Sequence, residues 1–204
     1  MKPISRFASL ITAAVSLVVS AHAQTVSQLQ TDGSIQVQYG EPLGQSFTAV
    51  NNELTSFEFN MDGNYNPVPN DPLALDILQG SGIGGAVLAS STFSLADGFD
   101  GWAGANFNLN VTNGQQYTAT LETDTPYWGV NTYDSDSVDP YSGGEGFIQG
   151  DLASSFFYST YADFQFQATF TDGSKVAVPD ASSTILMLSS ALLGLGVLRR
   201  RFAK

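Results

Sequence analysis

The stretch ADFQFQATF, residues 162–170, alternates between apolar and polar side chains. Phe164, Phe166, Ala168 and Phe170 fall on one side of this alternation, and two glutamines and a threonine fall on the other. Successive side chains of a β-strand point to opposite faces of the sheet. The period of two therefore predicts strand structure here, with one buried face and one solvated face.

The same alternation recurs along the chain before this stretch. It is clearest in LTSFEFNM (54–61), NFNLNV (106–111) and QYTATL (116–121), and further candidate strands are residues 35–39, 45–50, 73–78, 87–93 and 127–133. Glycine, asparagine and aspartate separate these runs at short intervals, and no long helical period appears among them. About eight to ten short strands predict an all-β fold over residues 24–172, an antiparallel two-sheet sandwich that is jelly-roll-like.

The N-terminus has the layout of a secretory signal peptide. Lys2 and Arg6 give a positively charged start, and residues 7–19 are mainly apolar. Ala21-His22-Ala23 then places small residues at the two positions that a signal peptidase reads. Residues 1–23 are therefore predicted to direct export and to be removed, so that the mature chain starts near Gln24.

The C-terminus carries a second address. After a linker at residues 173–184, residues 185–198 are apolar apart from two serines and two glycines. Counted from Ala181, eighteen residues lack a charge, which is just enough for a helix that spans a membrane. Three arginines follow at once, and a basic cluster of this kind stays on the cytoplasmic side. Residues 185–204 are predicted as a transmembrane helix with a basic stop; the alternative is a core helix of the globular domain.

Together these terminal elements resemble a sorting signal of the PEP-CTERM type, in which a short Val-Pro-acidic motif precedes an apolar helix and an arginine cluster. The motif consists of Val178, Pro179 and Asp180, and it is similar to the variant written VPDSG. The basic cluster consists of Arg199, Arg200 and Arg201. The resemblance implies recognition by an exosortase-type membrane protease in a Gram-negative bacterium that makes exopolysaccharide. It also implies transient anchoring in the inner membrane through the terminal helix before processing.

The predicted sandwich resembles bacterial extracellular domains that often precede such tails. The shared features are GQSFTA (44–49), ILQGSGIGGAVLASSTF (77–93), a tryptophan, YTATL (117–121) and a Tyr-Ser-Gly-Gly loop at 141–144. The resemblance implies the sandwich fold and leaves the activity unassigned, because one fold supports many functions.

The predicted mature domain is strongly acidic. All nineteen acidic residues and a single lysine lie between Gln24 and Asp180, which gives this interval a net charge of −18. Such a surface repels nucleic acids and anionic lipid headgroups, so its charge favours cations and neutral polymers as partners. The chain has no cysteine, and its one histidine, His22, lies in the predicted signal peptide. Thiolate metal sites, histidine-ligated zinc and a Ser-His-Asp triad are therefore excluded from the mature domain.

Acidic side chains crowd one loop of this domain. Asp134, Asp136 and Asp139 lie close together in the sequence, and Glu145 follows. Ca²⁺ takes about six to eight oxygen ligands, and the spacing begins like an EF-hand loop, but Val138 stands where a ligand is expected. The sequence predicts a calcium site of another kind at the four carboxylates; the alternative is a solvated surface loop.

Aromatic residues near strand ends or in loops are the candidate glycan contacts. They are Trp102, Tyr127, Trp128, Tyr133 and Tyr141. Sugar rings stack their C–H faces on such side chains, while amides and carboxylates bond the sugar hydroxyls. The alternative is that the tryptophans belong to the core.

These features predict an exported, non-enzymatic sandwich protein at the cell surface or in the extracellular matrix. Its expected role is structural or glycan-interacting, with extracellular polysaccharide as the partner. The alternative is a secreted glycan-active enzyme, because a pair of carboxylates suffices for glycoside hydrolysis without a histidine. No pair stands out among the nineteen acidic residues, so the sequence names no catalytic residue.

Overall fold

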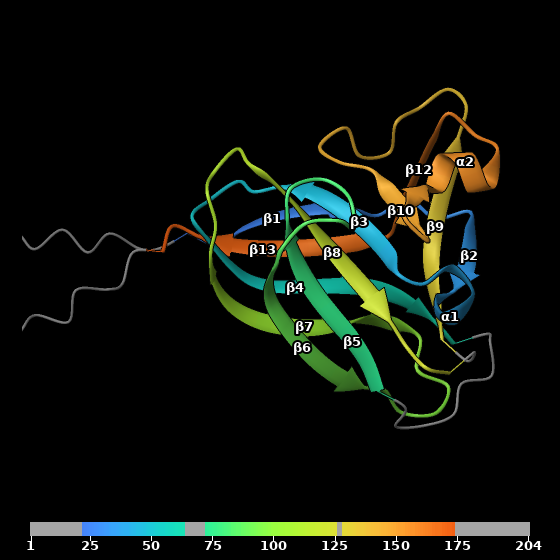
Figure 1. The fold of residues 1–204 in the computed structure, drawn as a ribbon, viewed down its shortest axis with the longest axis horizontal. Coiled ribbons are helices and arrows are strands. Elements are labelled where there is room, and N and C mark those ends of the chain that lie inside the picture. Colours follow the sequence, from blue (N-terminus) through green and yellow to red (C-terminus); the bar gives the residue numbers. More distant parts are fainter. Residues whose placement is uncertain (1–21, 64–71, 126–127, 174–204) are drawn as a thin grey trace, which may run out of the picture.

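The computed structural model describes residues 22–63, 72–125 and 128–173, which fold into two antiparallel β-sheets (Figure 1). The seven-stranded sheet contains β1 (Gln24–Gln28), β2 (Gly33–Gln36), β4 (Glu53–Asp62), β7 (Gly101–Asn110), β9 (Gly129–Ser135), β12 (Tyr161–Phe164) and β13 (Phe166–Thr171). The six-stranded sheet contains β3 (Leu43–Thr48), β5 (Pro72–Gln79), β6 (Val87–Ser94), β8 (Gln116–Glu122), β10 (Gly146–Ile148) and β11 (Asp151–Leu152). The helices of the described residues are short: α1 (Val37–Gly40) and α2 (Ala153–Phe157).

Antiparallel pairing holds throughout both sheets. The seven-stranded sheet has the order β1-β13-β4-β9-β12, with β7 beside β4 and β2 beside β9. The six-stranded sheet has the order β11-β10-β3-β8-β5-β6. The predicted all-β, antiparallel two-sheet sandwich is therefore confirmed over the described residues.

The alternating stretch at residues 162–170 forms two strands rather than one. Strand β12 ends at Phe164, and β13 begins at Phe166. Between them, Gln165 donates its backbone N–H to the carbonyl of Asn131 at 2.8 Å. Both phenylalanines are fully buried, as their place in the alternation predicts.

The strand predicted over residues 35–39 is wrong in its second half, because residues from Val37 onward form α1. Val37 donates its N–H to the carbonyl of Trp128 at 2.8 Å, and the carbonyl of Gly40 accepts from the N–H of Gln149 at 3.1 Å. These bonds to distant parts of the chain turn the backbone away from the extended conformation. The local alternation of residues 35–39 cannot indicate these partners, because they lie far away in the sequence.

The core joins the two sheets through phenylalanine rings. Phe57 of β4 stacks on Phe166 of β13, with ring centroids 5.5 Å apart and planes 4° apart. Phe47 of β3 lies 5.2 Å from Phe57, so rings from both sheets meet. Each of these side chains is fully buried, and burial of a phenylalanine contributes about 1.5–3 kcal/mol.

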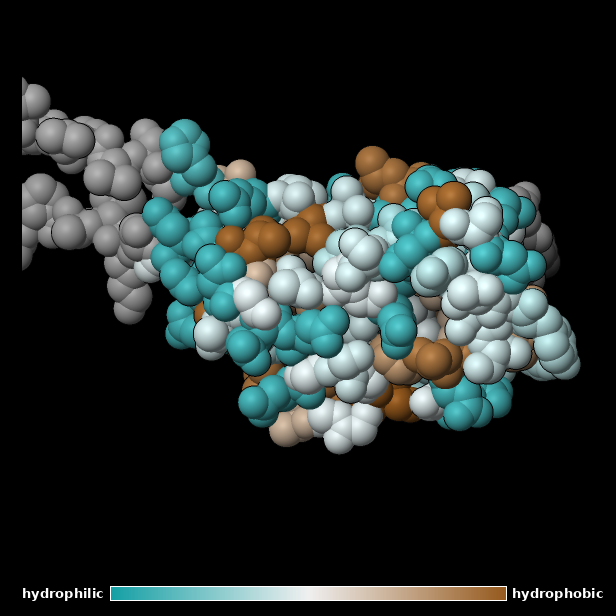
Figure 2. All heavy atoms as spheres, turned by 90° about the horizontal axis from the view of Figure 1, so that it is seen from above, coloured by the Kyte–Doolittle hydropathy of each residue, from teal (hydrophilic) through white to brown (hydrophobic). Residues whose placement is uncertain are grey.

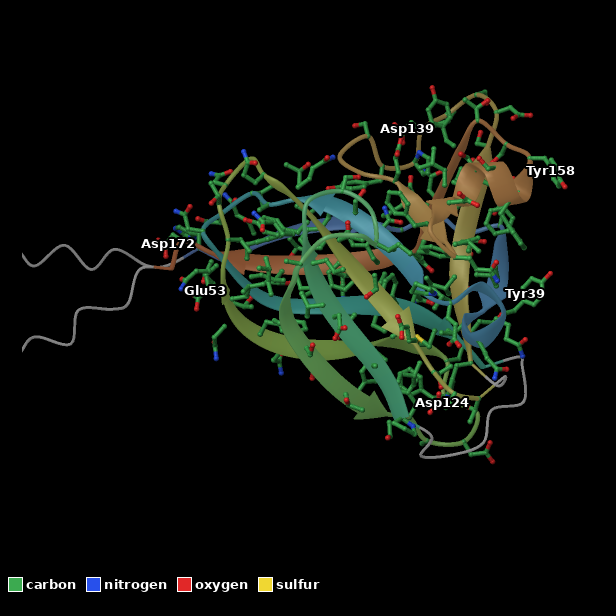
Figure 3. All side chains as sticks on the ribbon, in the orientation of Figure 1. Tyr39, Glu53, Asp124, Asp139, Tyr158 and Asp172 are labelled. Atoms are coloured by element: carbon green, nitrogen blue, oxygen red, sulfur yellow. The ribbon has the colours of Figure 1, made fainter. Side chains whose placement is uncertain are left out.

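The described part of the chain begins and ends at one end of the sandwich, since Gln24 pairs with Phe170. Figure 3 shows Glu53 and Asp172 at this end, with Tyr39 and Tyr158 at the opposite end. Within residues 22–63, 72–125 and 128–173, no helix is long and apolar enough to cross a membrane. The predicted signal peptide up to residue 21, and the sorting motif and terminal helix after residue 173, lie outside the described residues.

Candidate functional site

A polar pocket of about 290 Å³ lies where the loop before β10 meets α2 and β12. We call it the β12 pocket. Its lining residues are Ser81, Gln116, Asp139, Ser142, Gly144, Glu145, Gly146, Leu152, Ser154, Thr160, Tyr161, Ala162 and Asp163. Three carboxylates, several hydroxyls and an amide line this pocket, whereas Leu152 and Ala162 are its apolar members apart from glycine. Such a lining offers hydrogen bonds in many directions.

Asp163 is the buried carboxylate of the β12 pocket, with 3% of the residue exposed. The side chain of Gln45, from β3 in the other sheet, donates its Nε2–H to Oδ1 of Asp163 at 2.8 Å. The same amide accepts the backbone N–H of Phe164 at 2.8 Å through its Oε1. Gln45 therefore orients Asp163 and links the two sheets through a polar contact inside the core.

Burial raises the pKa of Asp163 to about 7, because desolvation penalises the ionised form. The hydrogen bond from Gln45 opposes this rise, while the negative charges of Asp139 and Glu145 add to it. The described residues contain no lysine or arginine that would compensate the charge. At neutral pH the Asp163 carboxyl can therefore either donate or accept a proton.

The loop that carries Glu145 is fixed to β3 by backbone and hydroxyl contacts. The N–H of Glu145 donates to Oγ of Ser46 at 2.8 Å, and the N–H of Ser46 donates to the carbonyl of Glu145 at 2.9 Å. A Cβ atom at Gly144 would lie 1.9 Å from the carbonyl oxygen of Ser46, so this approach requires glycine. Thr48 also donates its Oγ1–H to the carbonyl of Gly143 at 2.8 Å.

The four predicted calcium ligands do not assemble into one site. Oδ1 of Asp136 accepts the backbone N–H of Thr160 at 3.1 Å, and Oδ1 of Asp139 accepts the N–H of Tyr141 at 3.0 Å. In the part of the chain that the structure describes, no three aspartate, glutamate, histidine or cysteine residues form a group that could hold a metal ion. The described structure thus does not gather the four predicted ligands, and calcium binding stays a prediction from the sequence.

The four carboxylates divide between the β12 pocket and positions outside it. Asp139 and Glu145 line the β12 pocket. Asp134 lies in β9, where burial and then the charges of Asp32 and Asp136 raise its pKa. Two of the four residues predicted from the loop spacing therefore line the pocket. The spacing did not indicate Asp163, the third carboxylate of the lining.

The predicted glycan contacts that lie within the described residues do not gather at the β12 pocket. Trp128 is fully buried and cannot reach a ligand at the surface, so the prediction for this residue is wrong. Trp102 in β7 and Tyr133 in β9 are partly exposed, but neither lines the β12 pocket. Tyr127 lies outside the described residues.

Tyr141 serves the structure of the loop. Its ring packs edge-on against Phe166 with centroids 5.0 Å apart, and its hydroxyl oxygen accepts the N–H of Thr48 at 3.1 Å. Burial raises the pKa of the Tyr141 hydroxyl, and the hydrogen bond from Thr48 opposes this rise. Because the ring and the hydroxyl are both engaged with the sandwich, Tyr141 fixes the loop against it.

Three exposed aromatic side chains that sequence reasoning missed lie in α1 and in or just after α2, the helix that carries the pocket residue Ser154. Tyr39, Phe156 and Tyr158 are 62%, 40% and 94% exposed, and we call them the aromatic face. Tyr39 and Phe156 meet edge-on with ring centroids 6.1 Å apart. Tyr158 ends α2 in a left-handed conformation (φ 56°), with its N–H bonded to the carbonyl of the pocket residue Ser154.

The dense run SSFFYSTY, residues 154–161, was the available signal for this aromatic cluster. Apolar and polar residues do not alternate in this run, so the run does not predict a strand. Figure 3 shows Tyr39 and Tyr158 projecting outward at one end of the molecule, with Asp139 in the same half. Figure 2 shows that hydrophobic residues on the face seen from above form separate patches among hydrophilic and intermediate residues.

Comparison with known proteins gives a match at the end of the chain. The description of the matching family is VPDSG-CTERM motif, and the match covers residues 177–202. Residues 177–202 are a VPDSG-CTERM motif. The match includes Val178, Pro179, Asp180 and the three arginines, so the predicted PEP-CTERM-like sorting signal is confirmed. The VPDSG-CTERM motif indicates an exported protein that is anchored in a membrane and then processed by an exosortase-type enzyme.

No curated protein matches the chain. Among solved structures, the chain is similar to the infectious bursal disease virus VP2 subviral particle, with 16% identity and a TM-score of 0.29. The similarity covers 82% of this chain and 40% of the viral chain, so this protein spans less than half of that length. The function of the sandwich must therefore be argued from its own residues.

Proposed function

We propose that this chain is an exported, non-enzymatic glycan-binding protein that is sorted to the cell surface or the extracellular matrix. The observation that carries the proposal is the β12 pocket, a polar cavity with an exposed aromatic residue in its lining and the aromatic face nearby. Extracellular polysaccharide is the proposed partner.

The chemistry of the pocket suits a sugar. Carboxylates and hydroxyls such as Asp139, Glu145 and Thr160 can bond the hydroxyl groups of a pyranose ring. Tyr161 lines the pocket and is 37% exposed, so its ring is available to the C–H face of a sugar. A volume of about 290 Å³ lies near the lower limit of small-molecule sites, roughly 300–1,000 Å³, which suits a short segment of a longer polymer.

The position of the pocket suits a protein sorted by its C-terminus. The described chain ends beside Asp172, at the end of the sandwich away from Tyr39 and Tyr158 (Figure 3). While a protein of this kind is attached through its C-terminal region, the aromatic face points away from the attachment. A polymer outside the cell can then reach the face and the neighbouring pocket.

A binding assay with matched variants tests the proposal. The full chain, purified in detergent, is applied to an array of bacterial polysaccharides, and Tyr161→Ala and Tyr158→Ala are compared with Trp102→Ala. We expect glycan retention without turnover, weakened about tenfold in the tyrosine variants and unchanged in the tryptophan variant, because Trp102 belongs neither to the pocket lining nor to the aromatic face. Thermal melting confirms that each variant is folded. Retention of no glycan would contradict the proposal.

A second candidate is a glycan-active enzyme that uses a carboxylate pair. The observation that favours it is the pKa of about 7 at Asp163, in a pocket shared with Asp139 and Glu145. Glycoside hydrolysis needs one carboxyl that holds a proton and another that is ionised. Release of reducing ends from a retained glycan, lost in Asp163→Asn, would establish this candidate in place of the binding protein.

A further inference from the structure

We infer that the β12 pocket selects glycans that carry free amino groups, such as polymers of de-N-acetylated hexosamine, over neutral and uronic-acid glycans. This inference rests on the proposed glycan-binding function and names the class of glycan. It comes from the arrangement of charge, hydroxyl groups and aromatic surface in one cavity.

The charge of the pocket has one sign. Asp139 and Glu145, from the loop before β10, and Asp163, from β12, meet in one cavity, and the described residues contain no lysine or arginine to balance their charge. A uronic acid would add a further negative charge to this cavity. A protonated amine is the sugar substituent with the complementary charge.

The arrangement of the carboxylates favours an ammonium group over a metal ion. Within the described residues the acidic side chains form no group that could hold a metal. The pocket instead spreads three carboxylates and hydroxyls such as Ser142 and Ser154 over about 290 Å³. An ammonium group on a sugar ring fits such an arrangement, because it donates three separate hydrogen bonds while the ring hydroxyls take the remaining partners.

Asp139 is held through its carboxylate and Glu145 through its backbone. The loop at Asp139 is closed by the bond from the N–H of Tyr141 to its Oδ1. The N–H and the carbonyl of Glu145 are both bonded to Ser46. The backbone segments that carry the two charges are thus ordered before a ligand binds, which lowers the cost of ordering the site.

The aromatic ring of Tyr161 in the lining also favours a sugar that carries a positive charge. Tyr161 lies in the same lining as the three carboxylates. The face of an aromatic ring attracts a cation as well as the C–H groups of a sugar. A ring that bears an ammonium group therefore gains from Tyr161 and from the carboxylates together.

The test compares three oligosaccharides of equal length: glucosamine, N-acetylglucosamine and glucuronic acid oligomers. The full chain is titrated with each at one ionic strength and at a pH that protonates the sugar amines. We expect the glucosamine oligomer to bind at least about tenfold more tightly than the other two. Asp139→Asn and Glu145→Gln should each reduce this preference about threefold or more.

Asp97→Asn is the matched control, because Asp97 is exposed and lies outside the pocket while the substitution removes the same charge. An equal loss in Asp97→Asn would mean that the whole acidic surface attracts the amine, and it would overturn the inference. Equal affinity for glucosamine and N-acetylglucosamine oligomers would also overturn it and leave glycan binding in place. Retention of no glycan of any class would overturn both proposals.

Discussion

At the scale of the residue, Asp163 shows how a side chain can be both structural and available for chemistry. Its Oδ1 accepts the Gln45 amide inside the core, yet the residue also lines the β12 pocket. A buried carboxylate without a basic partner is costly when it is ionised, so its protonation is coupled to the stability of the fold.

The pH dependence of stability tests this coupling. The pKa of Asp163 rises from an ordinary 3.8 to about 7 on folding, so the folded state binds more protons than the unfolded state between these values. The free energy of unfolding therefore falls as the pH rises through this range. Asparagine keeps an acceptor for Gln45 and has no charge. We expect Asp163→Asn to be more stable than the native protein above about pH 7, by up to about 4 kcal/mol, and similar to it near pH 4.

Denaturant unfolding of the full chain at both pH values measures the difference. Asp97→Asn again serves as control, and its effect should not change with pH by a comparable amount. A loss of stability in Asp163→Asn that is the same at both pH values would show that the carboxyl is ionised throughout and needed as such.

At the scale of the element, the pocket depends on the contact between β3 and the loop before β10. Ser46 and Thr48 of β3 bond Glu145 and Gly143 of this loop. Asp136 ties the same region to the start of β12 by accepting the N–H of Thr160. These bonds hold the loop against β3 and near the start of β12, while the side-chain amide of Gln45 positions the carboxylate of Asp163.

Gly144→Ala tests the role of this contact. The added Cβ atom would lie 1.9 Å from the carbonyl oxygen of Ser46, so the loop must move away from β3. We expect a loss of about 2–3 kcal/mol in the free energy of unfolding, together with loss of glycan binding. Gly84→Ala is the control, because no atom lies within 4 Å of its added Cβ, and it should change stability by less than about 0.5 kcal/mol. Equal effects of the two substitutions would contradict the close approach at Gly144.

At the scale of the whole molecule, charge dominates. The full chain has a net charge of −12, and every lysine and arginine lies outside the described residues. Mutual repulsion destabilises a compact acidic domain, and dissolved ions screen that repulsion.

Salt should therefore stabilise the protein without regard to the identity of the cation. We expect the melting temperature to rise with ionic strength, and calcium to stabilise no more than sodium chloride of matched ionic strength, because among the described residues no three acidic side chains form a group that could hold a metal ion. The measurement is a melting series in calcium, EDTA and sodium chloride. A larger shift in calcium that Asp136→Ala abolishes would restore the four-carboxylate site predicted from the sequence.

The VPDSG-CTERM motif makes a prediction about the covalent form of the protein. Processing by an exosortase-type enzyme should remove the terminal apolar segment and the arginines, with cleavage between residues 179 and 182. Intact-mass analysis of the native protein measures this loss. Replacement of Pro179 and Asp180 by alanine should leave the chain at full length. A native protein that ends at Lys204 would instead be held by a simple membrane anchor.

The sequence by itself determined the features that depend on neighbouring residues. The alternation in residues 54–61, 116–121 and 162–170 specified strands, because the two faces of a strand follow from local backbone geometry. The order of motif, apolar run and arginines specified the sorting signal, because an enzyme reads it as a linear segment.

The tertiary structure decided the site. Asp163 meets Gln45, which lies 118 positions earlier in the chain, and the sequence around Asp163 carries no trace of this partner. Sheet packing buried Trp128 and fixed Tyr141, while the short helix α2 exposed Tyr158. Burial, pocket lining and the pKa of a carboxyl all depend on which distant segments pack together, and that pairing is set by the whole fold rather than by any local pattern.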